Sequence, residues 1–426
     1  MPRVYWCAPH PEPSGRSWRR RRCSVLLRRP PGQTWRRTDD MLNPMSAQAV
    51  ATDIGTVVVA VDSFKGSLTS SQACQAVAEG IRQGEPGQPV IAIPVADGGE
   101  GTLDAALAAG YEAVSTRCHG ATGDLAEVEW ARRGDDAVIE MAACCGLERA
   151  DRVSGPPAPQ RALAASSRGL GEVIAAALRA GVTSITIGIG GSASTDGGAG
   201  MLEALGARFL DRERNDIEAG AAGLETLDLV DLTHLNPRLA EVKLTVACDV
   251  TSPLLGEHGA AAVFGPQKGL DADGITRADR ALEMFAGAVE PALGVIHRDD
   301  PGAGAAGGAG FALLCLGATY RPGAQVVLGW SHAAEHIGVA SLVITGEGRL
   351  DHQTLLGKTP DAVRRMARQA GVPVWAVCGR CDLEGEDRDA FDGVLALSDI
   401  EPDPARSIAG ARGLLVRMVA EAMGPE

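Results

Sequence analysis

The sequence predicts an α/β protein built around a mainly parallel sheet. Short apolar, β-branched segments alternate from residue 56 onward with segments whose apolar residues recur at helical spacing. The 426 residues are 45% apolar but only 4% aromatic, a composition suited to close packing of helices on a sheet. At this length we expect two domains of roughly 100–200 residues each.

A capping pattern marks the first helix. Thr69 is followed three residues later by Gln72, the spacing at which each side chain can bond the other residue's backbone N–H. Apolar residues then recur at helical spacing until Gly84, which favours a helix end. With its flanking segments, this pattern predicts strand, helix, strand and helix over 56–61, 70–84, 90–95 and 103–109.

The rhythm changes between Tyr111 and Met141, where turn residues separate three short segments. These segments, 112–117, 126–132 and 136–141, predict antiparallel strands. The Pro-rich residues 154–161 predict a loop.

After residue 170 the alternation of helices and strands returns and continues to the end of the chain. We expect strands over 184–189, 243–248, 341–345, 372–377 and 394–397, and helices over 170–180, 198–205, 278–285, 307–318 and 404–422, with a further helix that begins at Thr359-Pro360-Asp361.

The first 40 residues differ in composition from the rest of the chain. They hold ten Arg and three acidic residues, a net charge of +7, whereas the remainder carries −21. They show no apolar periodicity, so we expect residues 1–50 to be a disordered or non-native N-terminal extension. An Arg-rich transit peptide is an alternative. A nucleic-acid-binding arm is disfavoured by the acidic remainder, and we expect no nucleic-acid partner.

Neither a membrane span nor a disulfide framework is expected. The longest uncharged stretch, 301–320, is rich in glycine and too weakly apolar to span a bilayer. Ten scattered cysteines predict reduced thiols and a cytoplasmic location. The pair Cys378 and Cys381 lacks a second CxxC or a paired histidine, which disfavours a redox or zinc role.

Five polar, glycine-containing loops follow predicted strands. In open α/β sheets, ligands bind outside the carboxyl ends of the strands. A single loop of this kind is weak support, because glycine and aspartate are common in βα turns. Five loops at the same predicted edge point together to an active site: 62–67, 97–102, 188–198, 248–251 and 345–351.

The loop 188–198 has the composition of an anion-binding site. Glycines and hydroxyl residues precede a helical pattern, so backbone N–H groups can point at a negative ligand. Asp196 would repel such a ligand unless it binds a cation or takes a proton. We therefore predict that Asp196 is the catalytic base of a phosphoryl-transfer enzyme, with an ordinary turn aspartate as the alternative.

Phosphoryl transfer also needs positive charge on the moving phosphate and magnesium to bridge the phosphates. Lys65, between a strand end and a capped helix, is the best candidate cation, with a solvated loop lysine as the alternative. Asp249, Glu347 and Asp351 are candidate magnesium ligands, since this ion prefers one or two carboxylates plus water. The sequence has no P-loop, no complete dinucleotide fingerprint and no G-x-S-x-G elbow.

Seven motifs in order resemble bacterial glycerate kinases of the type I family, from about Thr56 to the C-terminus. Three are Asp62-Ser63-Phe64-Lys65-Gly66-Ser67-Leu68, Ala96-Asp97-Gly98-Gly99-Glu100-Gly101-Thr102, and Gly190-Gly191-Ser192-Ala193 through Asp196-Gly197-Gly198. The others are Ala247-Cys248-Asp249-Val250 with Pro253-Leu254-Leu255-Gly256, Phe264-Gly265-Pro266-Gln267-Lys268-Gly269, Pro301-Gly302-Ala303-Gly304-Ala305-Ala306-Gly307-Gly308, and Ile344-Thr345-Gly346-Glu347-Gly348-Arg349-Leu350-Asp351.

The resemblance implies two α/β domains, one with a Rossmann-like parallel sheet and the other inserted in it with a mixed sheet. We expect the discontinuous domain at 56–110 plus 290–426, the inserted domain at 111–289, and the substrates in a cleft between them. Residues 1–50 have no counterpart in the family.

The resemblance also implies the reaction. It is ATP-dependent phosphorylation of D-glycerate, with Mg²⁺, at the 2-hydroxyl to give 2-phospho-D-glycerate and ADP. We expect the anionic acceptor to be bound by Ser63, Ser192 and Ser194, with Arg349 or Lys268 as charge partner. For the nucleotide we expect loop glycines: Gly190, Gly191, Gly302, Gly304, Gly346 and Gly348.

The sequence leaves alternatives open. Phosphorylation at the 3-hydroxyl is not excluded by the residues themselves. A nicotinamide-dependent 2-hydroxyacid oxidoreductase would share the α/β rhythm, as would a non-catalytic sugar-acid sensor. A homodimer is one oligomeric state to consider. Two departures from the family concern the site: Thr195 stands where asparagine is common, and Ser167-Arg168 belongs to a loosened version of a Thr-rich motif.

Overall fold

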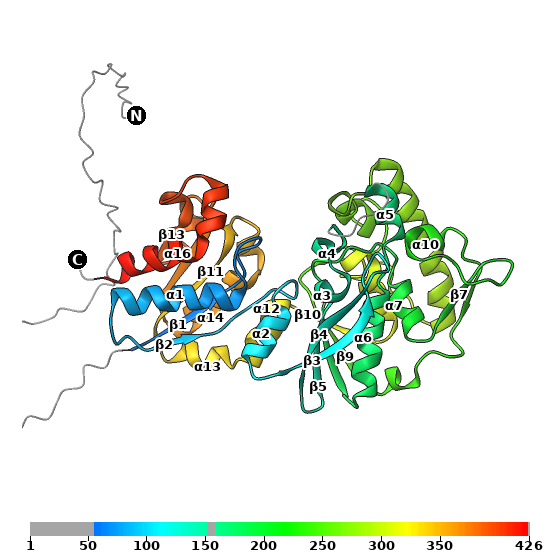
Figure 1. The fold of residues 1–426 in the computed structure, drawn as a ribbon, viewed down its shortest axis with the longest axis horizontal. Helices are drawn as coiled ribbons and strands as arrows, with labels where there is room; N and C mark the ends of the chain where they lie inside the picture. The colour runs from blue at the N-terminus through cyan, green and yellow to red at the C-terminus, as the bar shows by residue number, and fades with distance from the viewer. Residues whose placement is uncertain (1–54, 152–157, 425–426) are drawn as a thin grey trace, which may run out of the picture. The chain divides into compact units, whose positions relative to one another are not determined.

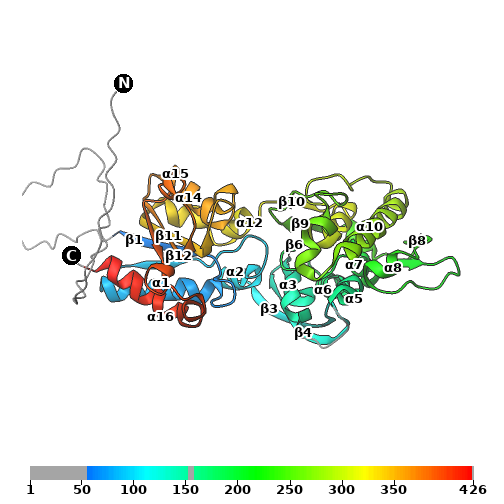
Figure 2. The ribbon, with the colours of Figure 1, turned by 90° about the horizontal axis from the view of Figure 1, so that it is seen from above.

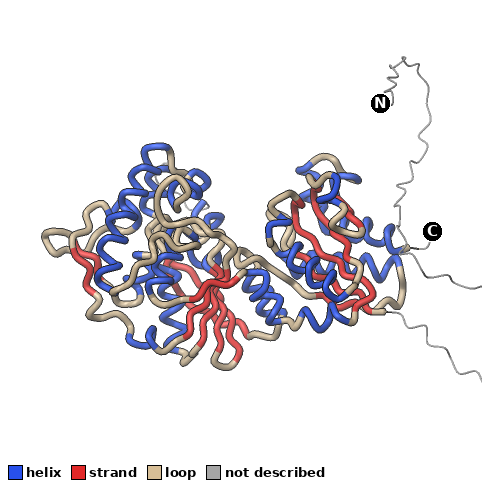
Figure 3. Tube along the Cα trace, turned by 180° about the vertical axis from the view of Figure 1, so that it is seen from behind, coloured by secondary structure: helices blue, strands red, loops and turns tan. Residues whose placement is uncertain are grey.

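The computed structural model describes residues 55–151 and 158–424 (Figure 1). The expected N-terminal extension, 1–50, lies outside the described residues. The fold is mixed α/β, as expected, with one parallel and one mixed sheet. A separate two-stranded ribbon pairs β7 (Arg208–Leu210) with β8 (Leu229–Asp231). Figure 3 shows the strands of the sheets in red among the covering helices.

The first sheet is entirely parallel and has the order β13-β12-β11-β1-β2. Its strands are β1 (Thr56–Val61), β2 (Val90–Ala92), β11 (Ala340–Leu350), β12 (Val374–Cys381) and β13 (Gly393–Ala396).

Alternate residues of β1 face two separate cores, so helices cover both faces of the sheet. Val57, Val59 and Val61 pack against α1 (Ser70–Gly84) and α16 (Pro404–Met423). Val58 and Ala60 pack on the other side, with α13 (Ala333–Gly338) and α14 (Thr359–Ala370). Figure 2 shows the strands between these two helix layers.

Helix α1 begins as predicted. The Thr69 hydroxyl accepts from the Gln72 N–H, and the Gln72 side chain accepts from the Thr69 N–H at 3.0 Å. Helix α16 packs along α1, and the contact depends on Gly80. A Cβ at Gly80 would lie 2.6 Å from the Val416 carbonyl oxygen.

The second sheet is mixed, with the order β10-β9-β6-β5-β4-β3. The three expected antiparallel strands form one side of it, and β5, β6, β9 and β10 run parallel. The strands are β3 (Glu112–His119), β4 (Leu125–Arg133), β5 (Asp136–Glu140), β6 (Ser184–Gly188), β9 (Lys243–Ala247) and β10 (Thr319–Arg321).

The remaining helices are mostly short. They are α2 (Thr102–Ala108), α3 (Met141–Cys145), α4 (Leu147–Asp151), α5 (Ala158–Ala164), α6 (Arg168–Arg179), α7 (Ala199–Ala204), α8 (Gly220–Leu224), α9 (Ala260–Phe264), α10 (Ala272–Leu293), α11 (Ala309–Cys315), α12 (Gly323–Trp330) and α15 (Gly385–Arg388). Single 3₁₀ turns are η1 (Pro237–Ala240), η2 (Pro266–Lys268), η3 (Ala305–Gly308), η4 (Thr354–Leu356) and η5 (Leu397–Asp399). Among the described residues, none of these helices has the length and apolar character needed to cross a membrane.

Two expected loops are wrong. Residues 345–350 continue strand β11, which pairs with β12 as far as Leu350 and Cys381. The glycines there serve close packing of strands, since a Cβ at Gly346 would lie 1.9 Å from the Val377 carbonyl oxygen. In the Pro-rich segment, residues 158–161 begin helix α5, and residues 154–157 lie outside the described residues.

We propose that the two sheets mark two domains, the first discontinuous and the second inserted in it. The insertion would extend to about residue 322 instead of 289. Strand β10 pairs with β9, and residues such as Ala303, Phe311 and Ala318 belong to the core of the mixed sheet.

Two helical glycines give opposite predictions for stability. Gly80→Ala should lower the free energy of unfolding by about 1–3 kcal/mol, because the added methyl overpacks the α1–α16 contact. Gly287→Ala in α10 should raise it by about 0.5–1 kcal/mol, since its Cβ meets nothing within 4 Å and alanine favours the helix. Urea unfolding of both variants measures the contrast. Equal effects would contradict the packing described for α1 and α16.

Candidate active site

Backbone contacts between glycines join the loops that follow β2, β6 and β9. The Gly190 N–H donates to the Gly98 carbonyl at 3.2 Å, and a Cβ at Gly190 would lie 2.5 Å from the Gly99 Cα. A Cβ at Gly98 would lie 2.1 Å from the Ala247 carbonyl oxygen. Only glycine permits these approaches, so the glycines of loops 97–102 and 188–198 bring three predicted strand-end loops together.

The loop after β1 lies against the extended end of β11. The Asp62 N–H donates to the Gly346 carbonyl at 2.8 Å. A Cβ at Gly348 would lie 3.4 Å from the Lys65 backbone nitrogen. Residues 62–65 and 346–348 are therefore neighbours at the carboxyl edge of the parallel sheet.

Asp196 is fully buried and accepts four hydrogen bonds. Its Oδ2 accepts from the Ser167 N–H at 2.7 Å, the Ser167 hydroxyl at 2.8 Å and the Gly200 N–H at 3.2 Å. Its Oδ1 accepts from the Gly198 N–H alone, at 3.1 Å. All four contacts are donated to it, which is the role of an ionised carboxylate.

Two helix N-termini create this arrangement. Ser167 is the N-cap of α6, and Gly198 is the N-cap of α7. The Ser167 hydroxyl also accepts from the Met201 N–H at 3.0 Å, so one side chain links both helices to Asp196. Backbone N–H groups freed at helix starts are natural partners for a negative charge.

Lys268 lies in the same region and is 7% exposed. Its ammonium group donates to the Ser192 hydroxyl at 3.0 Å and to the Ser194 carbonyl at 2.5 Å. Burial lowers the pKa of Lys268 to about 7, although the negative charge of Asp196 opposes the shift. The structure thus brings together Ser192, Ser194, Lys268 and Asp196, all of which the sequence assigned to the site.

A group of carboxylates with raised pKa values surrounds Asp97. Burial, and then the charges of Asp97 and Glu347, raise the pKa of Asp62 to about 8. Burial and the charge of Asp97 raise the pKa of Asp249 to about 6. Burial also raises the pKa of Glu347, against a 2.6 Å hydrogen bond from the Thr354 hydroxyl and the charge of Lys358. These carboxylates repel one another, and a bound cation would relieve the repulsion.

The donor set fits magnesium better than a metal held by protein alone. Within residues 55–151 and 158–424, no group of three or more His, Cys, Asp or Glu side chains is arranged to hold a metal ion. Magnesium commonly uses one or two carboxylates together with water and substrate phosphates. Glu347 and Asp249, with Asp62 and Asp97, could supply such carboxylates.

Arg349 and Asp351 are engaged elsewhere. The exposed Arg349 guanidinium pairs with Asp382 at 2.7 Å and with Asp351 at 3.8 Å. Asp351 also accepts from the Gln353 N–H at 2.9 Å, which stabilises the turn leading to η4. Their expected roles in binding acceptor and magnesium stay predictions.

Lys65 is exposed, and no carboxylate of the described residues forms an ion pair with it. Its positive charge acts on Glu100, whose pKa is raised by burial and by Glu148. Glu100 in turn lies close to Gly191. The adjacent Ser63 donates its N–H to Asp62 at 2.6 Å. No contact joins Lys65 to Asp196, so their expected convergence on one phosphate stays a prediction.

Packing alone accounts for several of the glycines expected to bind nucleotide. A Cβ at Gly302 would lie 2.4 Å from the Tyr320 ring, and one at Gly304 would lie 2.1 Å from the Pro253 carbonyl oxygen. Gly346 serves strand packing, as described above. Gly190, Gly191 and Gly348 lie where strand-end loops meet and remain candidates for nucleotide binding.

Sequence reasoning missed Ser167, Asp62 and Asp97 as individual site residues. A hydroxyl residue just before an apolar helical pattern was the available signal for Ser167. The signal for the two aspartates was their position after predicted strands.

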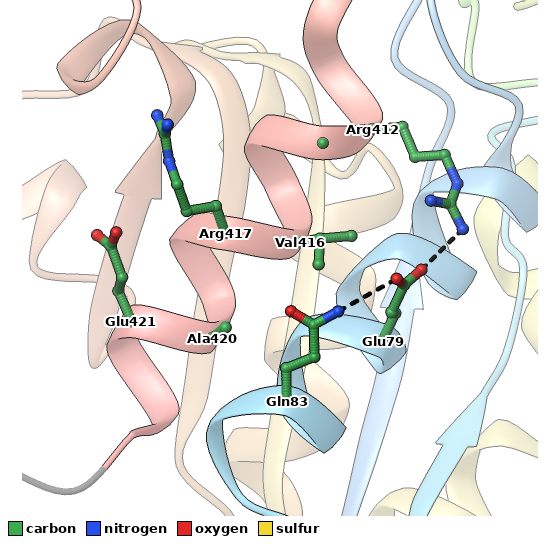
Figure 4. Close-up of a pocket in the computed structure, with 8 residues that line it drawn as sticks. Glu79, Gln83, Arg412, Val416, Arg417, Ala420 and Glu421 are labelled. Atoms are coloured by element: carbon green, nitrogen blue, oxygen red, sulfur yellow. Dashed lines mark hydrogen bonds and ion pairs between the residues drawn. The ribbon is translucent and has the colours of Figure 1, made fainter.

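Two pockets are found in the described residues. The first, of about 460 Å³, is lined by α1 and α16, with Glu79 bonded to Arg412 at 2.8 Å and to Gln83 at 3.2 Å (Figure 4). The second, of about 550 Å³, includes Ser166 and Arg168. Neither is lined by Lys65, Asp196 or Lys268.

Lys268 should make stability depend on pH. Its folded pKa lies below its ordinary value, so the unfolded chain binds more protons between about pH 7 and pH 10, and stability rises with pH there. From pH 7 to pH 9 the wild type should gain about 2 kcal/mol of unfolding free energy relative to Lys268→Met. Urea unfolding at both pH values measures this difference, and a difference that does not change with pH would contradict the burial of the amine.

Comparison with known proteins identifies the family of this chain. The model of the glycerate kinase family matches residues 57–424. Glycerate 2-kinase of Escherichia coli K12 is 45% identical over 329 residues, covering 76% of this chain and 84% of that protein. Glycerate kinase of Bacillus subtilis 168 is 44% identical over 327 residues, covering 76% and 84%.

A solved structure is also similar. The crystal structure of a Salmonella typhimurium LT2 protein, named provisionally as glycerate kinase 2, superimposes with a TM-score of 0.72 at 40% identity. The alignment covers 87% of this chain and 98% of that one. By these matches, the chain belongs to the glycerate kinase family, a family of phosphotransferases.

Proposed function

We propose that this protein transfers the γ-phosphoryl group of ATP to the 2-hydroxyl of D-glycerate, giving 2-phospho-D-glycerate and ADP. The observation that carries the proposal is the buried pair of Asp196 and Lys268 at converging strand-end loops. The name of the Escherichia coli relative, glycerate 2-kinase, supports the choice of the 2-hydroxyl.

Asp196 is suited to accept the proton of the attacking hydroxyl. Three donors occupy its Oδ2, whereas Oδ1 accepts only the Gly198 N–H and keeps a lone pair for the acceptor. Fixing one oxygen by hydrogen bonds orients the other, which is how a general base is positioned.

Lys268 and its neighbours are suited to bind the carboxylate of glycerate. An anion in contact with the Lys268 ammonium would favour its charged form and offset the burial that lowers its pKa. The Ser192 hydroxyl, already bonded to Lys268, would supply a further donor.

The nucleotide would be bound at the carboxylate group around Asp97. Magnesium would there neutralise part of the phosphate charge. One or two carboxylates from the set Glu347, Asp249, Asp62 and Asp97 would hold the ion, and Lys65 would donate to the phosphates. The Gly190 N–H is already donated to the Gly98 carbonyl, so the backbone N–H groups of Gly191 and Gly348 would be the ones to assist.

We also infer a cytoplasmic location. The cysteines of the described residues are free thiols, including Cys378 and Cys381, which supports a reducing compartment. A homodimer stays a prediction.

Purified protein with ATP, magnesium and D-glycerate should form one new phosphate ester. Phosphorus NMR resolves 2-phosphoglycerate from 3-phosphoglycerate, and we expect the former. Formation of 3-phosphoglycerate would correct the regiochemistry, whereas no ester and a glycerate-dependent change in nicotinamide absorbance would favour the oxidoreductase.

Ser167→Ala should lower kcat about 10- to 100-fold, because it removes one hydrogen bond to a charged group. Ser167→Thr should restore most of the activity, since it keeps the hydroxyl. Ser166→Ala is the matched control, because the Ser166 hydroxyl bonds the Arg168 N–H and not Asp196. Steady-state kinetics of the three variants, each checked for folding by circular dichroism, measures the effect. An unchanged kcat in a folded Ser167→Ala protein would remove Ser167 from the mechanism.

A further inference from the structure

Two neighbouring hydroxyls in the candidate site are buried without a hydrogen-bond partner. They are Oγ of Ser194 and Oγ1 of Thr195, residues that are 0% and 1% exposed. An unsatisfied buried hydroxyl costs about 1–3 kcal/mol, and native proteins keep few of them. Two in succession therefore call for an explanation.

The nearby hydroxyls do not share this property. The Ser192 hydroxyl accepts from Lys268, and the Ser167 hydroxyl bonds both Asp196 and the Met201 N–H. In this part of the site the missing partners are therefore those of Ser194 and Thr195; elsewhere in the described residues, Thr359 Oγ1 and Asp361 Oδ2 also lack a hydrogen-bond partner. Valine has nearly the shape of threonine and would fill the position of Thr195 without an unsatisfied oxygen.

The position of the two residues suggests what their hydroxyls bind. The Ser194 carbonyl accepts from the Lys268 ammonium, and Asp196 directly follows Thr195. Ser194 and Thr195 therefore stand between Lys268, the cation proposed to bind the carboxylate of glycerate, and Asp196, the proposed base.

D-Glycerate has three polar groups: a carboxylate, the 2-hydroxyl and the 3-hydroxyl. Under the proposed function, Lys268 receives the first and Asp196 the second. The 3-hydroxyl then needs a partner, and the two unsatisfied hydroxyls can both donate and accept.

We propose that Ser194 and Thr195 bind the 3-hydroxyl of the acceptor and so make the site select a dihydroxy acid over a monohydroxy acid. This inference rests on the proposed function. Both oxygens are covered in this structure, so the acceptor reaches them only when a covering segment moves. Gly307 packs against the backbone of these two residues, since a Cβ there would lie 2.0 Å from the Ser194 carbonyl oxygen and 2.7 Å from the Thr195 Cα.

Binding of two acids tests the proposal. D-Lactate keeps the carboxylate and the 2-hydroxyl of D-glycerate but lacks the 3-hydroxyl. Calorimetry should show that the wild type binds D-glycerate about 10- to 100-fold more tightly than D-lactate, the worth of one or two hydrogen bonds in a buried site. In Thr195→Val this preference should fall about tenfold, and Thr195→Ser, the matched control, should retain it.

Stability of the unliganded protein gives a second measurement. Thr195→Val should unfold at the same temperature as the wild type or higher, because it removes a hydroxyl that has no partner. A clearly lower unfolding temperature would mean that the Thr195 hydroxyl already has a partner, and the proposal would fall.

The outcomes distinguish a failure of this inference from a failure of the proposed function. Equal affinity of the wild type for both acids, or an unchanged preference in Thr195→Val, overturns the role of these hydroxyls even if D-glycerate is phosphorylated. Failure to phosphorylate D-glycerate in the product assay overturns the proposed function itself.

Discussion

The buried carboxylate of Asp196 is the interaction on which the rest of the site depends. It joins the start of α6 to the start of α7 through four donated hydrogen bonds, two of them from Ser167. Without this charge the N–H groups of Ser167 and Gly200 would lose their acceptor inside the protein, which is costly. The loop 192–195 directly before Asp196 presents the Ser192 hydroxyl and the Ser194 carbonyl to Lys268.

The site contains a buried lysine and several buried carboxylates, and burial disfavours the charged form of each. Lys268 is a cation whose burial lowers its pKa, and the carboxylates near Asp97 are anions whose burial and mutual repulsion raise theirs. A small carboxylic acid would relieve the first, and a metal-bound nucleotide the second. A kinase with an anionic acceptor needs a cation for the acceptor and carboxylates for the metal-bound nucleotide, and buried groups of both kinds have shifted pKa values here.

Much of this could be predicted from local sequence. The capping box at Thr69, the strand-end loops other than 345–351, and the unusual position of the Asp196 carboxylate among glycines and hydroxyls are encoded within a few residues. Ser167 could not be placed in the same way, because its contact with Asp196 spans 29 residues and arises only when α6 packs on α7. Glycines were ambiguous for a related reason. The glycines of 345–351 suggested a turn, and those of 301–304 suggested a nucleotide-binding loop. In the structure, Gly346, Gly302 and Gly304 instead allow close packing against neighbouring residues.

A crystal structure with D-glycerate and a magnesium complex of a non-hydrolysable ATP analogue would show whether Asp196 and Lys268 bind the acceptor. We expect the glycerate carboxylate against Lys268, its 2-hydroxyl within hydrogen-bond distance of Asp196 Oδ1, and the γ-phosphate close to both that hydroxyl and Lys65. Glycerate bound away from Asp196 and Lys268, for example in the pocket between α1 and α16, would contradict this expectation.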